Sequence, residues 1–118
     1  MTPESPIELA DFEALLELLD RDTMREVVTL FAIAAPEHMI VVCRSIASGE
    51  ARVVATAFHT MRSGCGQLGA RHLEELCVNA ERSAKAGDLA GTAALLDLAA
   101  VELERCLGWF REHRWVDS

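Results

Sequence analysis

Apolar residues recur with the period of an α-helix along most of the chain. In the clearest stretch, residues 54–68, apolar side chains are spaced i, i+4, i+7, i+11 and i+14 and therefore lie on one face of a helix. This stripe consists of Val54, Phe58, Met61, Cys65 and Leu68. Similar stripes, one of which includes Leu30 and Phe31, predict helices over about residues 5–21, 22–48, 50–67, 70–86 and 87–114.

Residues that start or stop helices lie between these stripes. Ser5 followed by Pro6 suits the first helix start, and Asp22 or Thr23 suits the second. The later turns contain glycine: Ser48-Gly49, Gly69 and Gly87-Asp88.

The order of these elements predicts the fold class. Pro36 removes the amide that would bond Ala32, so we expect a kink or break inside the second helix. Short loops make consecutive helices antiparallel. The sequence therefore predicts one all-α domain over residues 1–118, an antiparallel up-down-up-down four-helix bundle with a short extra N-terminal helix.

Composition and charge narrow the class of protein. Hydrophobic residues make up 51% of the chain and charged residues 25%, which is typical of a folded domain. The net charge of −8 argues against nucleic acid or an anionic membrane as the partner. The acidic N-terminus lacks the apolar core of a signal peptide, and the longest apolar run, residues 39–43, is too short to span a bilayer. We expect a cytoplasmic monomer.

The cysteines do not form a recognisable metal or disulfide pattern. Each can be placed on an apolar stripe, which predicts free, buried thiols for all four: Cys43, Cys65, Cys77 and Cys106. A metal or haem bundle that uses His59, His72 and cysteines is disfavoured, because the chain contains no CxxC, HxxxH or ExxH pair. We expect no metal site.

One histidine faces away from the apolar stripe of its helix. His59 lies about 150° from the centre of the stripe, so we expect it to face water. Its helical neighbours are small residues and two arginines, namely Arg52, Ala55, Thr56, Arg62, Ser63 and Gly66, with no carboxylate. Such surroundings let another protein approach the imidazole and favour an anion on it. A plain surface histidine on a structural bundle is the alternative, and the chain's carboxylates are interpreted as solvated.

The stretch from His59, HTMRSGCGQLGA, resembles the signature of histidine-containing phosphotransfer (Hpt) domains. That signature is His, two residues, Lys or Arg, small residues, and then Leu-Gly before the next helix. The resemblance extends over about residues 15–110 and includes residues 31–36, Gly49, Leu76-Cys77 and Ala86-Gly87-Asp88.

The resemblance implies a four-helix bundle with an exposed histidine. Such domains accept a phosphoryl group from an aspartyl phosphate on the receiver domain of a response regulator or hybrid histidine kinase, and pass it to another receiver. They are carriers without kinase or phosphatase activity. They need no cofactor of their own, because the receiver supplies the Mg²⁺.

The resemblance also assigns roles to particular residues. His59 becomes the phosphoryl acceptor, through Nε2, while Arg62 and Ser63 contact the phosphoryl oxygens. Arg52 and Arg62 are expected to favour the neutral imidazole that a nucleophile requires. Receiver docking is assigned to Arg52, Ala55, Thr56, Gly66 and Lys85.

Two positions depart from the family pattern. Arg62 stands where Lys is usual, and Ser63 precedes Gly64 where the family has Gly before Ser. Gly64 should lie on the opposite flank, where another helix packs closely. The exchanged order leaves an alternative, a degenerate Hpt-like bundle that acts only as a docking or inhibitory module. Because the chain opens with Met and holds little beyond one bundle, we expect a free-standing carrier rather than part of a hybrid kinase.

Overall fold

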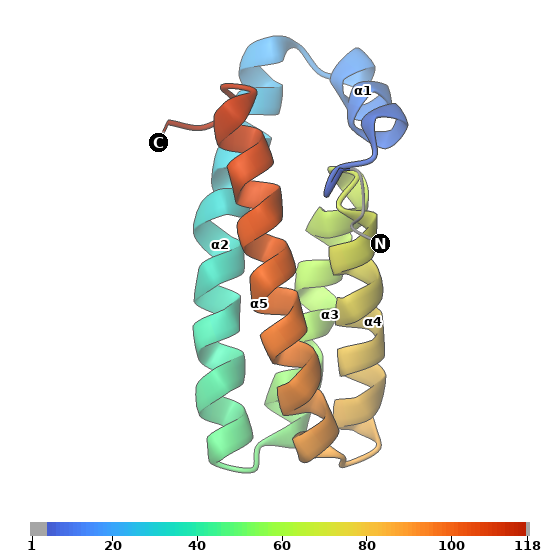
Figure 1. Cartoon of the computed structure of the whole chain (residues 1–118), viewed down its shortest axis with the longest axis vertical. Helices are drawn as coiled ribbons and strands as arrows, with labels where there is room; N and C mark the ends of the chain where they lie inside the picture. The colour runs from blue at the N-terminus through green and yellow to red at the C-terminus, as the bar shows by residue number, and fades with distance from the viewer. Residues whose placement is uncertain (1–4, 118) are drawn as a thin grey trace.

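The computed structural model describes residues 5–117, which contain five helices and no strand. The helices are α1 (Leu9–Leu18), α2 (Arg21–Ala47), α3 (Ala51–Gln67), α4 (Arg71–Lys85) and α5 (Leu89–Glu112). Figure 1 shows α2 to α5 side by side, with α2 and α4 running against α3 and α5, and with α1 across one end. The predicted all-α bundle with a short extra N-terminal helix is confirmed.

The helix ends agree with the sequence except at the first two starts. The cap of α2 is Asp20, whose side chain accepts a hydrogen bond from the Thr23 amide at 2.7 Å, so the predicted cap at Asp22 or Thr23 was wrong by two or three residues. The predicted start at Ser5 was also wrong, because the Ser5 hydroxyl bonds Ile7 in a turn and α1 begins only at Leu9. Buried Ile7 holds this preceding turn against the core.

Helix α2 continues through Pro36 as one helix of 27 residues, so of the predicted kink or break the break is absent, and the kink stays a prediction. Buried residues lie on both sides of the proline, including Phe31, Ala35 and Val42. Their packing outweighs the loss of one backbone hydrogen bond.

Helix α2 is also more apolar on its exposed side than the sequence interpretation assumed. Leu30, which was predicted to face inward, is 66% exposed, because it lies about 100° around the helix from buried Phe31. By length and composition alone α2 could cross a membrane, with a mean hydropathy of 1.6 over 18 residues. Core helices of soluble bundles meet the same criterion, so the expected lack of a membrane span stays a prediction.

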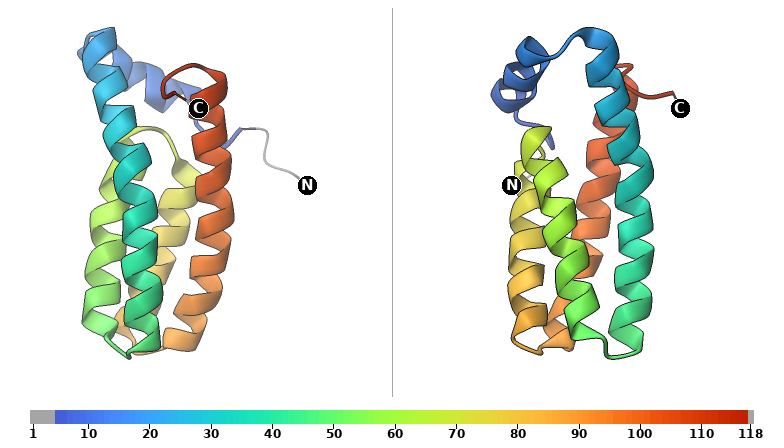
Figure 2. Two further views of the ribbon diagram at one scale, coloured as in Figure 1. Left: turned by 90° about the vertical axis from the view of Figure 1, so that its left-hand side faces the viewer. Right: turned by 180° about the vertical axis from the view of Figure 1, so that it is seen from behind.

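Helix α1 closes one end of the bundle (Figure 2). The Glu8 amide donates to the Gly69 carbonyl at 2.7 Å, and Asp11 pairs with Arg71 at the start of α4. Phe12 packs edge-on against Trp109 and Trp115, with ring centroids 5.3 and 5.2 Å away. These contacts tie the N-terminal segment and the C-terminal tail to the same end of the core.

Three of the four cysteines lie in the core as free thiols, as predicted: Cys65, Cys77 and Cys106. Cys43 is exposed, so the prediction of a buried thiol was wrong there. The cause is its position about 100° around α2 from fully buried Val42.

Helix α3 packs against α2 on one side and, most extensively, against α4 on the other. Gly64 lies on the α2 side, as its position predicted, but a Cβ added to it would lie 3.4 Å from a ring carbon of Phe31, which is an ordinary van der Waals contact, so the packing does not require glycine there. On the α4 side lies His59.

Candidate functional site

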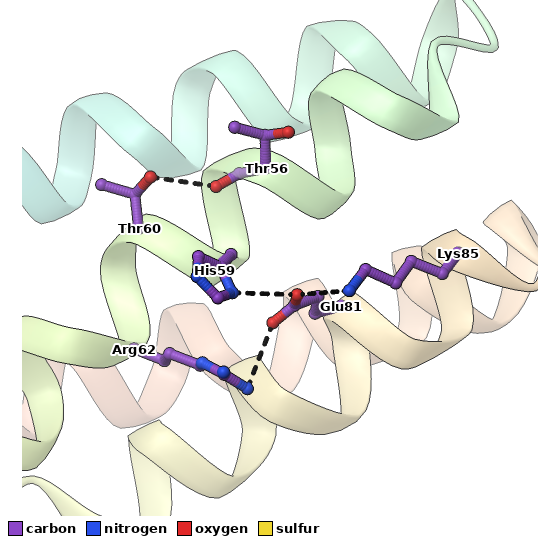
Figure 3. Close-up of polar contacts among 6 residues, drawn as sticks. All are labelled: Thr56, His59, Thr60, Arg62, Glu81 and Lys85. Atoms are coloured by element: carbon purple, nitrogen blue, oxygen red, sulfur yellow. Dashed lines mark hydrogen bonds and ion pairs between the residues drawn. The ribbon is translucent and has the colours of Figure 1, made fainter.

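His59 lies at the surface of α3, where its side chain is 59% exposed. The neighbouring residues Phe58 and Met61 are buried and fix the helix in the bundle. Figure 3 shows that the imidazole is turned toward α4 rather than straight into solvent. The structure thus places the ring where a partner protein can reach it.

A buried carboxylate on α4 lies directly beneath the imidazole. Glu81 is only 4% exposed, and its Oε2 lies 3.0 Å from Nδ1 of His59. The same oxygen lies 2.9 Å from Nζ of Lys85, and Oε1 lies 3.3 Å from Nη1 of Arg62. One buried carboxylate therefore connects three basic side chains from two helices (Figure 3).

These contacts determine the charge of the carboxylate. Burial alone raises the pKa of the Glu81 carboxyl, but hydrogen bonds from Lys85 and His59 and the charges of Lys85 and Arg62 outweigh burial. The net pKa lies below the usual range, so Glu81 is ionised at neutral pH and can only accept hydrogen bonds.

The ionised carboxylate fixes the tautomer of the histidine. Because Glu81 can only accept, the 3.0 Å contact requires a proton on Nδ1 of His59. A neutral imidazole with this proton carries its lone pair on Nε2. Within residues 5–117 no hydrogen bond or ion pair engages Nε2, and Figure 3 shows the second ring nitrogen on the side away from Glu81. The site therefore presents an unengaged lone pair at the surface.

The other residues singled out in the sequence differ in their exposure. Arg52, Thr56 and Ser63 are exposed. Ala55 is only 5% exposed and forms a floor rather than an outer surface. Gly66 is half-buried, and a Cβ added there would lie 2.6 Å from Oε2 of Glu74. A side chain at Gly66 would thus displace a carboxylate of α4, whereas its predicted role in receiver clearance stays a prediction.

Glu81 is the residue that the sequence interpretation missed. The absence of a carboxylate near His59 held only for the residues of α3 itself. The available signal was the position of Glu81 four residues after Cys77 and three before Ala84, both on the inward stripe of α4. A charge on an inward stripe needs a partner, and Lys85 stands four residues later.

No group of three or more histidine, cysteine, aspartate or glutamate side chains within residues 5–117 is placed to hold a metal ion.

One comparison with known proteins gives a match. The family model of the Hpt domain matches residues 3–112, which is nearly the whole chain. Searches of curated proteins and of solved structures give no match. The matched segment contains every helix described above, together with the exposed histidine and the carboxylate that holds it. The chain belongs to the Hpt domain family.

Proposed function

We propose that this chain is a phosphoryl carrier of a two-component phosphorelay, in which His59 takes a phosphoryl group from an aspartyl phosphate of one receiver domain and passes it to another. Hpt domains act in histidine phosphotransfer as carriers rather than enzymes, with receivers or histidine kinases as partners. The observation that carries the assignment to His59 is its Nδ1 contact with buried Glu81, which leaves the lone pair on exposed Nε2.

The forward step begins with the lone pair of Nε2. This lone pair attacks phosphorus, the bond from phosphorus to the receiver's aspartyl oxygen breaks, and the electron pair of that bond stays on the receiver carboxylate. His59 then carries a positive charge shared with its Nδ1–H group, which Glu81 stabilises at 3.0 Å. A Mg²⁺ ion held by the receiver would neutralise charge on the phosphoryl oxygens, so we propose that this chain acts without a cofactor of its own.

Arg62 and Lys85 form ion pairs with Glu81, and we propose that they also contact the phosphoryl group. Both contact the Glu81 carboxylate, and both remain accessible, with side chains 37% and 66% exposed. A dianionic phosphoryl group on Nε2 would attract the same two cations. Ser63, exposed one turn beyond His59, is the proposed additional donor.

The return step reverses these changes. The bond between Nε2 and phosphorus breaks, the electron pair returns to Nε2, and the phosphoryl group moves to the aspartate of the next receiver. Glu81 keeps the proton on Nδ1, so the departing ring leaves as a neutral imidazole. The same hydrogen bond supports transfer in both directions.

We also propose which partners this protein binds and where it acts. The partners are receiver domains of response regulators or hybrid histidine kinases, and the carrier acts as a cytoplasmic monomer without nucleic acid or membrane. The net charge of −8 supports the exclusion of nucleic acid and anionic lipid.

Radiolabel transfer from phosphorylated receivers tests the proposal. Wild-type protein and His59→Gln are incubated with a panel of ³²P-phosphorylated receiver domains, and His72→Gln serves as the matched control, because His72 is an exposed histidine on α4. We expect acid-labile label on the wild type and on His72→Gln, and none on His59→Gln. A protein that bound the receivers but took no label would support the docking-only alternative instead.

A further inference from the structure

A cavity of about 460 Å³ opens at the end of the bundle where α2 begins and α5 ends, and no described residue of α3 or α4 lines it. Figure 1 shows these two helix ends next to each other, beside the C-terminus. We propose that the cavity binds a small phosphate ester whose remaining part carries hydroxyl or amino groups, as sugar phosphates and nucleotides do. The inference goes beyond the proposed function, because phosphoryl transfer at His59 does not use this site.

Three exposed arginines line the cavity. Arg25 comes from α2, Arg111 from the last turn of α5, and Arg114 from the turn that follows. Within residues 5–117, no carboxylate pairs with Arg25 or Arg114. Arg111 contacts Glu104 at 3.5 Å, but the Glu104 side chain is 72% exposed, so a ligand can replace this contact at little cost. Guanidinium groups bind phosphate oxygens through paired N–H groups.

Arg25 is already fixed beside the cavity. Its Nη1 donates to the Arg114 carbonyl oxygen at 2.5 Å, and its guanidinium carbon lies 5.7 Å from the centre of the Trp115 ring. Trp115 is only 5% exposed and packs against Phe12, so this ring is a rigid support. A side chain that is ordered in advance loses less entropy when a ligand binds to its remaining N–H groups.

Arg114 occupies a position where this chain otherwise has glycine. Helices α2 to α5 all end in the same turn, in which two amides beyond the helix donate to carbonyls of its last turns. The turn places one residue at positive φ, and after α5 this residue is Arg114, with φ of +60°. After the other three helices it is a glycine: Gly49, Gly69 and Gly87, with φ of +76°, +81° and +81°. Glycine would form this turn with less strain, so the backbone does not account for an arginine there.

The helix dipole does not account for the three cations together. A cation near the C-terminal end of a helix is stabilised by the dipole, which suits Arg111 and Arg114. Arg25, however, lies near the start of α2, where the dipole gives a cation no such advantage. The three arginines therefore share a cavity rather than a helix end, as groups that bind one anion do.

The geometry and charge of the cavity select the class of anion. A phosphate ester is tetrahedral and can bond guanidinium groups from several directions, whereas one guanidinium fork satisfies a planar carboxylate. Glu112 and Asp117 also line the cavity, and neither forms an ion pair with the three arginines in the part of the chain that the structure describes. Both can accept hydrogen bonds from hydroxyl or amino groups beside the phosphate. The volume is that of a small-molecule site.

Isothermal titration calorimetry tests the proposal on the full chain. The ligands are glucose 6-phosphate, AMP and GMP, with glucose, adenosine and inorganic phosphate for comparison. Arg114→Gly and Arg111→Gln each remove one guanidinium of the cavity. Arg44→Gln is the matched control, because Arg44 is an exposed arginine of α2 that does not line the cavity.

We expect at least one of the three esters to bind the wild type and Arg44→Gln equally, and to bind Arg114→Gly and Arg111→Gln about tenfold more weakly. Urea unfolding should show Arg114→Gly to be at least as stable as the wild type, so its weaker binding would not reflect unfolding. An Arg114→Gly variant less stable than the wild type would contradict the inference, because the arginine would then serve the fold.

The remaining outcomes are equally decisive. If none of the three esters binds the wild type, or if Arg114→Gly binds them as tightly, the cavity is not their site. If inorganic phosphate binds as tightly as the esters, Glu112 and Asp117 take no part and the assignment to an ester is wrong. His59→Gln should bind the esters like the wild type, so the result is independent of whether His59 carries a phosphoryl group.

Discussion

Nδ1 of exposed His59 lies 3.0 Å from Oε2 of buried Glu81, which comes from the neighbouring helix. The carboxylate is ionised, so it holds the proton on Nδ1 and leaves the lone pair on Nε2. Two further cations, Arg62 and Lys85, contact the same carboxylate. Helix packing thus builds the arrangement that the proposed nucleophile would need, an imidazole with an orienting carboxylate.

The charge of Glu81 should matter separately from its hydrogen bond. Glu81→Gln keeps an oxygen that accepts from Nδ1 but removes the negative charge that would stabilise a phosphorylated ring. We expect Glu81→Gln to slow labelling by a phosphorylated receiver about tenfold, and Glu81→Ala, which removes both, about a hundredfold. Rapid-quench kinetics measure the rates, and Glu75→Gln, an exposed carboxylate of the same helix, is the control. Equal rates in Glu81→Gln and the wild type would show that the charge of Glu81 is not required, and equal rates in Glu81→Ala would remove Glu81 from the mechanism.

The low pKa of Glu81 predicts how stability depends on pH. Such a carboxyl group, whose pKa is lower in the folded than in the unfolded chain, stabilises the fold at pH values above its unfolded pKa of ~4.3. It loses this contribution as the pH falls through its folded pKa. We therefore expect the difference in unfolding free energy between wild type and Glu81→Gln to be complete at neutral pH and to shrink below about pH 4.

Urea unfolding at several pH values measures this difference. The pKa values of Asp11 and Asp20 are also lowered, by the side chain of Arg71 and by the amide of Thr23. Both aspartates are present in both proteins, so their contributions cancel. A difference that stayed constant down to pH 3 would mean that the Glu81 carboxyl is not stabilised in its ionised form.

Arg62 should be replaceable by the residue usual in the family. Its guanidinium lies 3.3 Å from Oε1 of Glu81 and forms an ion pair with it, but Oε1 accepts no hydrogen bond, so the contact depends on charge. We expect Arg62→Lys to retain transfer within about threefold and Arg62→Ala to lose about tenfold. Comparison of kcat for the two variants with one phosphorylated receiver checks this. A loss in Arg62→Lys as large as in Arg62→Ala would show that the guanidinium fork itself is required.

Two glycines with the same backbone angle should respond differently to substitution. Gly69 and Gly87 both have φ of +81°, but a Cβ on Gly69 would lie 2.6 Å from the Glu8 carbonyl oxygen, whereas Gly87 has nothing within 4 Å. We expect Gly87→Ala to lower the free energy of unfolding by about 1 kcal/mol and Gly69→Ala by about 3 kcal/mol. Chemical denaturation measures both, and equal losses would mean that α1 is not fixed by this contact.

The parts of the fold that the sequence predicts best are set by local signals. The stripes of α3, α4 and α5 and the turns at Gly49, Gly69 and Gly87 depend on residues close together in the chain. The wrong expectations depend on distant contacts. Ser5 does not cap a helix, because the preceding turn is held by Ile7 in the core and by the bond from Glu8 to Gly69.

In the candidate site, too, the sequence predicts the features that one helix determines and misses those that the packing of two helices determines. The exposure of His59 follows from its angle to one helix stripe. Its partner Glu81 follows only from the packing of two helices, because the two residues are 22 positions apart. Ala55 was predicted to lie on the outer face beside His59, but it is only 5% exposed, so its placement on that face was wrong. A pattern along one helix cannot show what the adjacent helix places against it.

The central claim is tested most directly by measuring which histidine nitrogen carries phosphorus. Protein containing ¹⁵N-labelled histidine is phosphorylated by a receiver and analysed by NMR for coupling between ¹⁵N and ³¹P. We predict phosphorus on Nε2 of His59, with Nδ1 still protonated against Glu81. Phosphorus on Nδ1, or on any other histidine, would contradict the account.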